Sequence, residues 1–333
     1  MRVAITGASG FLGGSLAEMY HERGDEVVAL VRQSSDTSIL EQLEAKLIVG
    51  ELTEQDSFNR LVEDTDLAIH CAAMATDFGP WEQFQAINVD ASRMFFEACV
   101  KHKVPRVIYI SSVAVYGNGM HHRGTDEDAP FEQIITDNYT RSKILVERIA
   151  YDFIDQKSLP LTIIRPGYIW GNGDRAVMPK MIAAIKKRQV AVIDGGVNLM
   201  NLTHIENLVQ GIMLAAESEK AIGRVYNITD GSKVSTKRFF EDLFQLLGVE
   251  IKLRSFPYVP SYIAAYLAEI YCRLTGYKKY PPFTRYTVKM GEYDQVFDIS
   301  RAIYELGYKP KVRYKEGMAG MIRFVRRLYY GQK

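Results

Sequence analysis

The sequence has few cysteines and almost no net charge. Only Cys71, Cys99 and Cys272 occur among 333 residues, and none of them has a Cys-x-x-Cys or Cys/His ligand spacing. Three cysteines cannot all pair, so we expect buried thiols in a reducing compartment, with the cytoplasm as the default. The 41 basic and 40 acidic side chains nearly cancel, which excludes a field that would draw the whole molecule to nucleic acid.

Long apolar segments and metal-ligand patterns are also missing. No run of about 18 uncharged apolar residues occurs, so we expect no bilayer-spanning helix. We also expect no signal peptide, because no basic-then-apolar leader stands at residue 1. His70 lies in an apolar segment and His121 and His122 in a polar one, without further ligands nearby, so we expect no metal site. Small molecules are the expected partners, and a homodimer is left open.

A glycine-rich turn follows the first apolar segment, Val3–Thr6. Glycines at positions 7, 10 and 13 precede apolar residues at helical spacing up to residue 20, which predicts a strand, a tight turn and a helix. Such a turn lets the main chain approach a dinucleotide pyrophosphate at the positive end of the helix. The candidate contacts in this turn are Gly7, Ser9, Gly10, Phe11, Leu12 and Gly13.

A second predicted strand, residues 26–31, ends at Arg32. An acidic residue usually stands here when the bound cofactor lacks a 2′-phosphate, because a carboxylate accepts hydrogen bonds from the ribose hydroxyls. Arg32 is either a solvated arginine at a strand end or a ligand of the 2′-phosphate of NADP. We therefore expect NADP as the preferred cofactor, with NAD as the alternative.

The centre of the chain carries candidate catalytic residues. Ser111 and Ser112 follow a predicted strand, residues 106–110, and precede Val-Ala-Val-Tyr-Gly. Tyr139 and Lys143 are four residues apart in a predicted helix, so their side chains lie on one face and can reach the same ligand.

Four motifs in this order resemble the extended short-chain dehydrogenase/reductase superfamily over essentially the whole chain. They are the Gly-x-x-Gly-x-x-Gly turn, His-x-Ala-Ala at residues 70–73, Ser-Ser-x-x-Val-Tyr-Gly at 111–117, and Tyr-x-x-x-Lys at 139–143. The resemblance implies an α/β fold with a doubly wound parallel Rossmann sheet and a smaller C-terminal α/β substrate lobe. It also implies an NAD(P)-dependent dehydrogenase or reductase.

The resemblance assigns roles to four candidate catalytic residues. It implies that Tyr139 exchanges a proton with the alcohol or carbonyl, Ser112 hydrogen-bonds that oxygen, and Lys143 holds the ribose and lowers the pKa of Tyr139. The same resemblance implies that Asn88 supports a water relay. Lowering a tyrosine pKa by about 3 units requires roughly 4 kcal/mol of preferential phenolate stabilisation. Lys143 and an oxidised nicotinamide, both cationic, are the expected sources.

Further cofactor contacts follow from the same resemblance. Glu51 and Leu52 stand where a Gly-Asp-Leu segment usually lies near the adenine. Cys71, Ala72 and Ala73 lie at a strand end, and Arg-Pro-Gly-Tyr-Ile-Trp-Gly at residues 165–171 resembles the stretch that caps the nicotinamide. The additional candidates are Pro166, Tyr168, Ile169, Tyr139 and Lys143. We expect residues 1–170, with a returning segment at about 195–230, to form the Rossmann domain, and residues 171–194 and 231–333 to form the substrate lobe.

At two places the sequence departs from the patterns of dehydratases and nucleotide-sugar enzymes, and both departures bear on the expected reaction. Val113 and Ala114 stand where dehydratases usually carry an Asp-Glu pair, and Met200 and Asn201 stand where nucleotide-sugar enzymes carry Arg-Asp. Other segments, at residues 77–81, 196–199, 283–286 and 298–310, resemble the branch of 3β-hydroxysteroid dehydrogenases, sterol-4α-carboxylate dehydrogenases and 2-alkyl-3-oxoalkanoate reductases. The alternative hypothesis for the function is a nucleotide-sugar epimerase or dehydratase, and a third hypothesis is a non-catalytic dinucleotide sensor.

An aromatic stretch at residues 256–286 points to the substrate. It carries nine tyrosine or phenylalanine residues and few acids, so we expect either a packed helical core or contact with a sterol-like or long-chain 3-hydroxy/3-oxo acyl substrate. Peripheral membrane contact, aided by Arg323, Arg326 and Arg327, is left open. The candidate substrate residues are Met74, Trp81, Val113, Tyr168, Trp170 and Arg285.

Overall fold

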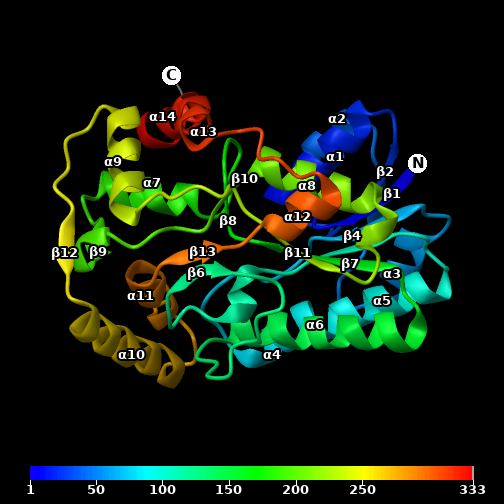
Figure 1. The fold of residues 1–333 in the computed structure, drawn as a ribbon, viewed down its shortest axis with the longest axis horizontal. Helices are drawn as coiled ribbons and strands as arrows, with labels where there is room; N and C mark the ends of the chain where they lie inside the picture. Colours follow the sequence, from blue (N-terminus) through cyan, green and yellow to red (C-terminus); the bar gives the residue numbers. More distant parts are fainter. Residues whose placement is uncertain (332–333) are drawn as a thin grey trace.

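A seven-stranded parallel sheet forms the centre of the protein (Figure 1). The computed structural model describes residues 1–331. The strands of the sheet are rich in Val, Ile, Leu and Ala and, apart from the edge strand β3 (Lys46–Val49), are mostly buried on both faces, as expected for a parallel sheet covered by helices. Across the sheet they are β11 (Val225–Ile228), β7 (Leu161–Pro166), β5 (Val107–Ile110), β4 (Leu67–His70), β1 (Arg2–Thr6), β2 (Glu26–Val31) and β3 (Lys46–Val49).

Strand order reverses at β1. Ala4 of β1 is in register with Val28 of β2 on one side and with Ala68 of β4 on the other. The crevice beyond the carboxyl ends at such a reversal is where open α/β sheets bind ligands. This topology confirms the predicted α/β Rossmann fold and places the glycine turn at the crevice.

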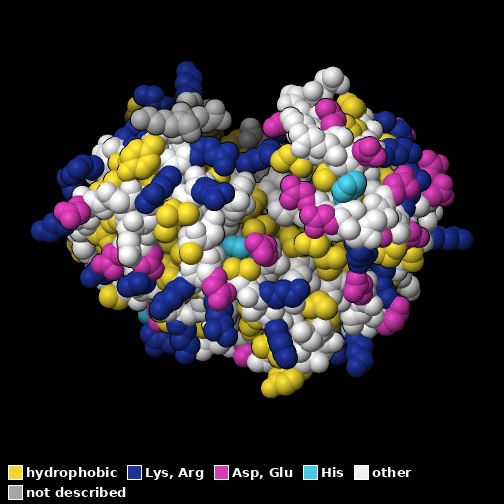
Figure 2. All heavy atoms as spheres, turned by 90° about the horizontal axis from the view of Figure 1, so that it is seen from above, with side chains coloured by type: hydrophobic (Ala, Val, Ile, Leu, Met, Phe, Trp, Pro, Cys, Tyr) yellow, Lys and Arg dark blue, Asp and Glu magenta, His cyan; other side chains and the backbone are white. Residues whose placement is uncertain are grey.

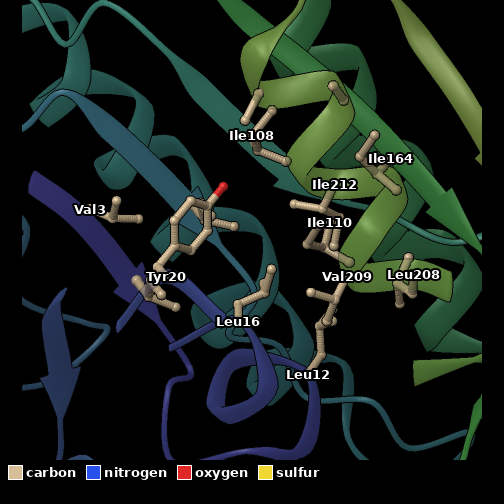
Figure 3. Packing of buried hydrophobic residues seen from close by; sticks show 14 of the residues in the cluster. Val3, Leu12, Leu16, Tyr20, Ile108, Ile110, Ile164, Leu208, Val209 and Ile212 are labelled. Carbon is tan, nitrogen blue, oxygen red and sulfur yellow. The ribbon is translucent and has the colours of Figure 1, made fainter. Parts of the chain in front are cut away.

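Helices cover both faces of the sheet. Because successive strand residues face opposite sides, Val3 and Ile5 join one core cluster while Ala4 joins the other. On the first face, α1 (Phe11–Glu22) packs against α8 (Ile205–Glu217), with α2 (Ser38–Gln42) and α12 (Ser300–Leu306) nearby (Figure 3). On the second face lie α3 (Gln55–Val62), α5 (Ala91–Lys101) and α6 (Asn138–Lys157).

A third core cluster lies beyond the sheet, around the buried side chains of Trp170, Phe239 and Met321. It is enclosed by α7 (Met178–Lys186), α9 (Thr236–Leu247), α13 (Tyr314–Gly320) and α14 (Ile322–Tyr330). Two further helices, α10 (Tyr258–Leu274) and α11 (Arg285–Glu292), lie at the lower left of Figure 1. Short parallel pairs link the parts: β8 (Tyr168–Trp170) with β10 (Leu202–His204), β9 (Ala191–Ile193) with β12 (Arg254–Phe256), and β6 (His122–Thr125) with β13 (Gln295–Phe297).

The start of α6 is fixed by its N-cap. The carboxylate of Asp137 accepts a hydrogen bond of 2.7 Å from the main-chain N–H of Thr140, which satisfies one of the unpaired N–H groups at the first turn. The helix then carries Tyr139 and Lys143 on the face that points to the sheet. None of the helices within residues 1–331 is both long and apolar enough to cross a membrane.

Candidate active site

The glycine turn, the end of β4 and the start of α1 form a tight cradle. Gly7 has a φ of +71°, and a Cβ added there would lie 2.9 Å from the main-chain nitrogen of Ala72. A Cβ on Gly13 would lie 2.3 Å from the carbonyl oxygen of Gly7. Gly10 is the N-cap of α1 and has no side chain to bind the N–H groups of the first turn, which also carries no acidic residue. These N–H groups are therefore available to a phosphate, so the cradle fits a dinucleotide.

His70 packs beneath this cradle. Its Nδ1 lies 2.8 Å from the hydroxyl oxygen of Thr6 and its Nε2 lies 3.1 Å from that of Ser92. Burial, with the nearby charge of Lys143, lowers its pKa to about 3, so the ring is neutral. His70 is thus a buried residue of β4 with a partner at each ring nitrogen. Among residues 1–331 no group of three or more His, Cys, Asp or Glu side chains is arranged to hold a metal ion.

The structure brings Ser112, Tyr139 and Lys143 together at the carboxyl end of β5. Ser112 caps a short 3₁₀ helix, η2 (Val113–Tyr116), by accepting a hydrogen bond of 3.2 Å from the N–H of Ala114. Its side chain also faces Tyr139 closely enough to lower the pKa of that hydroxyl. Lys143 donates from Nζ to the carbonyl oxygen of Ile110 at 2.8 Å, and Nζ lies 3.4 Å from the hydroxyl oxygen of Tyr109.

Burial controls the protonation of Tyr139 and Lys143. Desolvation raises the pKa of Tyr139 above its usual value of 10, and the side chain of Ser112 opposes the rise only in part. Burial lowers the pKa of Lys143 to about 8, against the charge of Glu147. Lys143 is held against β5 by its bond to Ile110, and the pKa of Tyr139 is raised, whereas the resemblance implies that it is lowered. Tyr139 is therefore protonated near neutral pH and able to donate.

Asn88 connects two segments of the site. It lies in a π-helical turn, η1 (Gln85–Asp90), an irregularity often found at functional sites. Its Oδ1 accepts from the N–H of Met74 at 2.7 Å, and its Nδ2 donates to the hydroxyl of Ser142 at 2.9 Å. These bonds tie the segment after β4 to α6, so the geometry shows a positioning contact.

A buried ion pair behind the site was not predicted from the sequence. Glu147, one turn after Lys143, is fully buried and accepts from Arg165 Nε at 2.9 Å and from the Ser111 hydroxyl at 2.5 Å. Arg165 also donates to the hydroxyl of Tyr116 at 2.6 Å. Because the hydroxyl of Ser111 is bonded to Glu147, Ser111 faces the ion pair, while Ser112 faces Tyr139. This arrangement agrees with the choice of Ser112 as the candidate catalytic serine.

Tyr286 is a second residue that the sequence reading missed. Its ring packs edge-to-face against the ring of Tyr139, with 6.5 Å between centroids. The neighbouring Arg285 turns away and forms an ion pair of 2.8 Å with Glu269 of α10. The charge of Arg285 is paired with Glu269, and Tyr286 is the residue of this segment that faces Tyr139. A substrate contact by Arg285 stays a prediction.

Three other candidate substrate side chains pack elsewhere. The ring of Trp81 lies under the guanidinium of Arg141, at 3.8 Å, on the solvent-facing side of α6. Trp170 is fully buried and donates from Nε1 to Asp230 at 2.8 Å. The ring of Tyr168 points into the third core cluster, where it meets Phe239 edge-to-face. Each of the three side chains has these contacts within the protein, and their interpretation as substrate contacts stays a prediction.

The remaining candidates keep positions near the crevice. Met74 is partly exposed in the segment held by Asn88, and Val113 is buried just after Ser112. Cys71, Ala72 and Ala73 follow β4 directly. The main chain of Pro166, Tyr168 and Ile169 continues from β7 into β8, where Tyr168 donates its N–H to the carbonyl oxygen of Asn201 at 2.8 Å.

Two arginines lie at the other end of the crevice. Arg32 follows β2 with an exposed side chain, and its main-chain N–H donates to the hydroxyl of Ser35 at 3.1 Å. Arg175, in the loop before α7, places Nη1 3.5 Å from the carbonyl oxygen of Ser9 and 3.7 Å from the carboxylate of Asp36. Arg175 thus reaches from the third core cluster to the glycine turn, a contact with no signal in the sequence. Glu51 is exposed at the end of β3 and Leu52 is partly buried.

The surface agrees with a small-molecule site. Basic and acidic side chains both occur across the face seen from above (Figure 2), without one large patch of a single sign. A hollow of about 310 Å³ on the surface is lined by residues that include His204, Glu206 and Glu316. Ser112, Tyr139 and Lys143 are not among the residues that line this hollow.

Comparisons with known proteins agree with this geometry. The sequence pattern of the NAD dependent epimerase/dehydratase family matches residues 3–229. A 4-hydroxy-2-methyl-3-oxo-4-farnesyl-3,4-dihydroquinoline-1-oxide ketoreductase from Stigmatella aurantiaca is 28% identical over 318 residues, covering 96% of this chain and 95% of that protein. A decarboxylating sterol-4-alpha-carboxylate 3-dehydrogenase from Dictyostelium discoideum is 29% identical over 325 residues, covering 95% of this chain and 98% of that protein.

The fold is also similar to solved structures. A UDP-glucuronic acid 4-epimerase from Bacillus cereus, in complex with NAD, superposes with a TM-score of 0.79 and 21% identity, covering 99% of this chain and 100% of that chain. At this identity the likeness establishes the architecture and leaves the choice of substrate to the residues of the site.

Proposed function

This chain belongs to the NAD-dependent epimerase/dehydratase family, and we propose that it interconverts a secondary alcohol and a ketone on an apolar substrate by hydride transfer. The observation that carries the proposal is the grouping of Ser112, Tyr139 and Lys143 beside the glycine cradle. The three side chains come from the end of β5 and the first two turns of α6, so rigid elements hold them.

Each residue has a distinct part in this proposal. A nicotinamide dinucleotide held in the cradle supplies or accepts the hydride. Tyr139, whose pKa is raised by burial, donates its proton to the carbonyl oxygen of the substrate. Ser112 hydrogen-bonds the same oxygen and orients it toward Tyr139. Lys143, held by its hydrogen bond to the carbonyl oxygen of Ile110, places a positive charge beside the site. The Glu147–Arg165 pair fixes the next turn of α6.

An apolar substrate is supported by the surroundings of Tyr139. The aromatic ring of Tyr286 covers one side of it, and the buried, apolar Val113 and Ala114 follow Ser112. Neither position supplies the acid/base pair that elimination of water from a sugar needs. Both curated relatives described above carry names of ketone or sterol chemistry. A sterol-like or long-chain 3-hydroxy/3-oxo acyl compound is the proposed substrate class.

A nucleotide-sugar epimerase or dehydratase is the second candidate. The fold likeness to an epimerase favours it only at the level of architecture. At the place where such enzymes carry an arginine for the diphosphate, this chain has Met200, and the carbonyl of Asn201 is bonded to the N–H of Tyr168. No cation stands at these two positions to bind an anionic diphosphate.

NADP is the proposed cofactor, in preference to NAD. No carboxylate stands at the first position after β2, where Arg32 is exposed, and Arg175 lies close to the same end of the crevice. Both guanidinium groups can form charge-assisted hydrogen bonds to a 2′-phosphate. Asp36 opposes this preference, although its carboxylate already accepts from the N–H of Ser38 and lies 3.7 Å from Arg175.

We also propose the division into a Rossmann domain, residues 1–170 with 195–230, and a substrate lobe, residues 171–194 with 231–333. A cytoplasmic location with peripheral membrane contact is part of the same proposal. The homodimer left open by the sequence stays a prediction.

A substrate panel tests the proposed reaction. Purified protein is incubated with NADPH or NADH and with 3-oxo steroids, long-chain 2-alkyl-3-oxo acids, or UDP- and GDP-sugars, and the products are read by mass spectrometry. The proposal expects reduced apolar products, two mass units heavier than the ketones. Conversion of the nucleotide sugars without any conversion of the apolar ketones would replace it with the second candidate.

A further inference from the structure

The helix α10 carries an apolar face that no other element covers. Its exposed apolar residues recur at the spacing of one helical face, and two of them, Leu267 and Leu274, are 60% and 82% exposed. The same face includes Val259, Ile263, Tyr266 and Tyr271. Exposed apolar surface of this extent on a helix marks a site of interaction. Figure 1 shows α10 at the edge of the molecule, with no helix or strand beyond it.

The opposite face of α10 holds the helix on the protein. Ala265, Glu269 and Cys272 are buried at helical spacing. The carboxylate of Glu269 accepts from the main-chain N–H of Arg285 at 2.7 Å, and the helix packs against α11. The outward direction of the apolar face is therefore fixed by buried polar and apolar contacts on the other side.

Positive charge flanks the apolar face at both ends. Lys252 and Arg254 precede α10, Lys278 and Lys279 follow it, and all four side chains are exposed. Glu269 is the one acidic residue between positions 251 and 283, and its charge is paired with Arg285 in the buried face. The outward surface is thus apolar in the middle and cationic at its ends, with no exposed acid in this segment.

We propose that α10 docks this face onto an anionic lipid surface. An amphipathic helix with aromatic and leucine residues on one face and flanking lysines lies in the plane of a membrane interface, where anionic headgroups attract the cations. A second copy of the chain is disfavoured as the occupant, because pairing two such faces would bring cationic ends together without compensating carboxylates. The arginines of α14 do not belong to this surface, since α14 packs against α7 and α9.

The surface leads directly to the candidate active site. The chain leaves α10 toward Tyr280 and Thr284, whose hydroxyls both hydrogen-bond to the carboxylate of Asp77 in the segment after β4. Two residues further, Tyr286 packs against Tyr139. Docking would therefore place a membrane beside the segment that runs from α10 to Tyr286, next to the catalytic tyrosine. This link rests on the proposed reaction, whereas the test of lipid binding below does not depend on that reaction.

Vesicle flotation tests the surface. The full-length protein, without substrate, is mixed with vesicles of two compositions. One is phosphatidylcholine alone, and the other contains about 30 mol% of the anionic lipid phosphatidylserine. We expect binding to the mixed vesicles and little to the neutral ones. The double variant Leu267→Ser/Leu274→Ser should lose at least about tenfold in partition coefficient because it removes the two most exposed leucines of the face.

Two further variants separate charge from general surface effects. Lys278→Gln/Lys279→Gln should weaken binding to anionic vesicles by roughly thirty-fold, about fivefold for each charge. The control Tyr304→Ser removes an 85% exposed aromatic residue from α12, far from α10 in the sequence, and should bind as wild type. A second control, Arg323→Gln/Arg327→Gln on α14, should also be unchanged.

The outcomes distinguish lipid docking from other roles of the surface. Equal vesicle binding by the wild type and the leucine double variant would overturn the proposal. So would a wild-type dimer that the leucine double variant converts to a monomer in analytical ultracentrifugation. Reduction of the apolar ketones of the substrate panel, supplied without vesicles, is measured in parallel: if no protein reduces any of them, the proposed reaction fails while the lipid result stands.

Discussion

Lys143 donates a hydrogen bond of 2.8 Å to the carbonyl oxygen of Ile110, the last residue of β5. This bond joins the catalytic face of α6 to the carboxyl end of the central sheet. Because Ser112 lies two residues after Ile110, the same junction fixes the serine relative to Tyr139 and Lys143. The candidate catalytic group is thus held by contacts between β5 and α6, and such rigid support is what precise positioning of catalytic groups requires.

The Glu147–Arg165 pair should contribute strongly to stability. Replacing Glu147 with Gln leaves the buried guanidinium of Arg165 without its charge partner, and we expect a loss of about 3 to 5 kcal/mol in the free energy of unfolding. Urea titration followed by circular dichroism measures it. The control is Asp56→Asn, which breaks the exposed pair with Arg60 and should cost less than about 1 kcal/mol. Equal losses in the two variants would contradict a structural role for the buried pair.

Asp137 should make stability fall as pH rises from about 4 to about 6. Burial raises its pKa from 3.8 to about 6, so over this range the unfolded chain releases the proton while the folded protein retains it. The free energy of unfolding then decreases with pH, by as much as about 3 kcal/mol.

Asp137→Asn isolates this effect, because an asparagine can still cap α6. We expect the free energy of unfolding of the variant not to fall with pH over this range. The difference in unfolding free energy between wild type and variant therefore changes sign or size between pH 4 and pH 6. Parallel stability curves for the two proteins in chemical denaturation would show that Asp137 does not titrate in this way.

Some of the site follows from the sequence and some does not, for identifiable reasons. The sequence directly carries local backbone preferences and helical spacing. These predict the glycine turn, the succession of strands along the chain and the helix face shared by Tyr139 and Lys143. Periodicity also indicates that Glu147 faces inward, yet it cannot name Arg165, eighteen residues later, as its partner. The contacts of residues 81, 168 and 170 do not follow from the sequence, because an aromatic residue beside a site and one packed against the rest of the protein share the same pattern.

The contact between Tyr286 and Tyr139 shows the same limit. The two residues are separated by 147 positions and come from α11 and α6. Only the packing of α10 and α11 on the rest of the protein brings them together. The motif around residues 283–286 was noticed, but the pairing of Arg285 with Glu269 decides which of its side chains faces the site.

Gly13→Ala should damage the cofactor cradle. The added methyl group would lie 2.3 Å from the carbonyl oxygen of Gly7 and 2.9 Å from Cα of Ala8, so α1 must move away from the turn. We expect weaker dinucleotide binding by at least about tenfold, together with lower stability, although alanine favours helices. Gly320→Ala is the matched control, since nothing lies within 4 Å of its added Cβ. Fluorescence titration with NADPH gives both affinities, and an unchanged value for Gly13→Ala would contradict the close packing of this turn.

Arg32→Ala should reduce the preference for NADPH over NADH by roughly ten- to a hundred-fold, as expected for loss of a charge-assisted hydrogen bond. Arg175→Ala should reduce it further if both guanidinium groups reach the 2′-phosphate. Calorimetric titration with 2′,5′-ADP and with 5′-ADP measures the effect without turnover. Lys180→Ala, an exposed cation on α7, serves as the control. A wild type that binds the two nucleotides equally would rule out the proposed preference.

Tyr139→Phe tests the central claim most directly. The substitution removes one hydroxyl while leaving the ring to pack against Tyr286, so the fold and the affinity for NADPH should be nearly unchanged. The measurement is the transfer of deuterium from C4-deuterated NADPH to an apolar ketone that the wild type reduces, followed by mass spectrometry. The account predicts deuterated alcohol with the wild type and at least about a hundredfold slower formation with Tyr139→Phe, because the proton donor is lost. Deuterium transfer by Tyr139→Phe at close to the wild-type rate would contradict it.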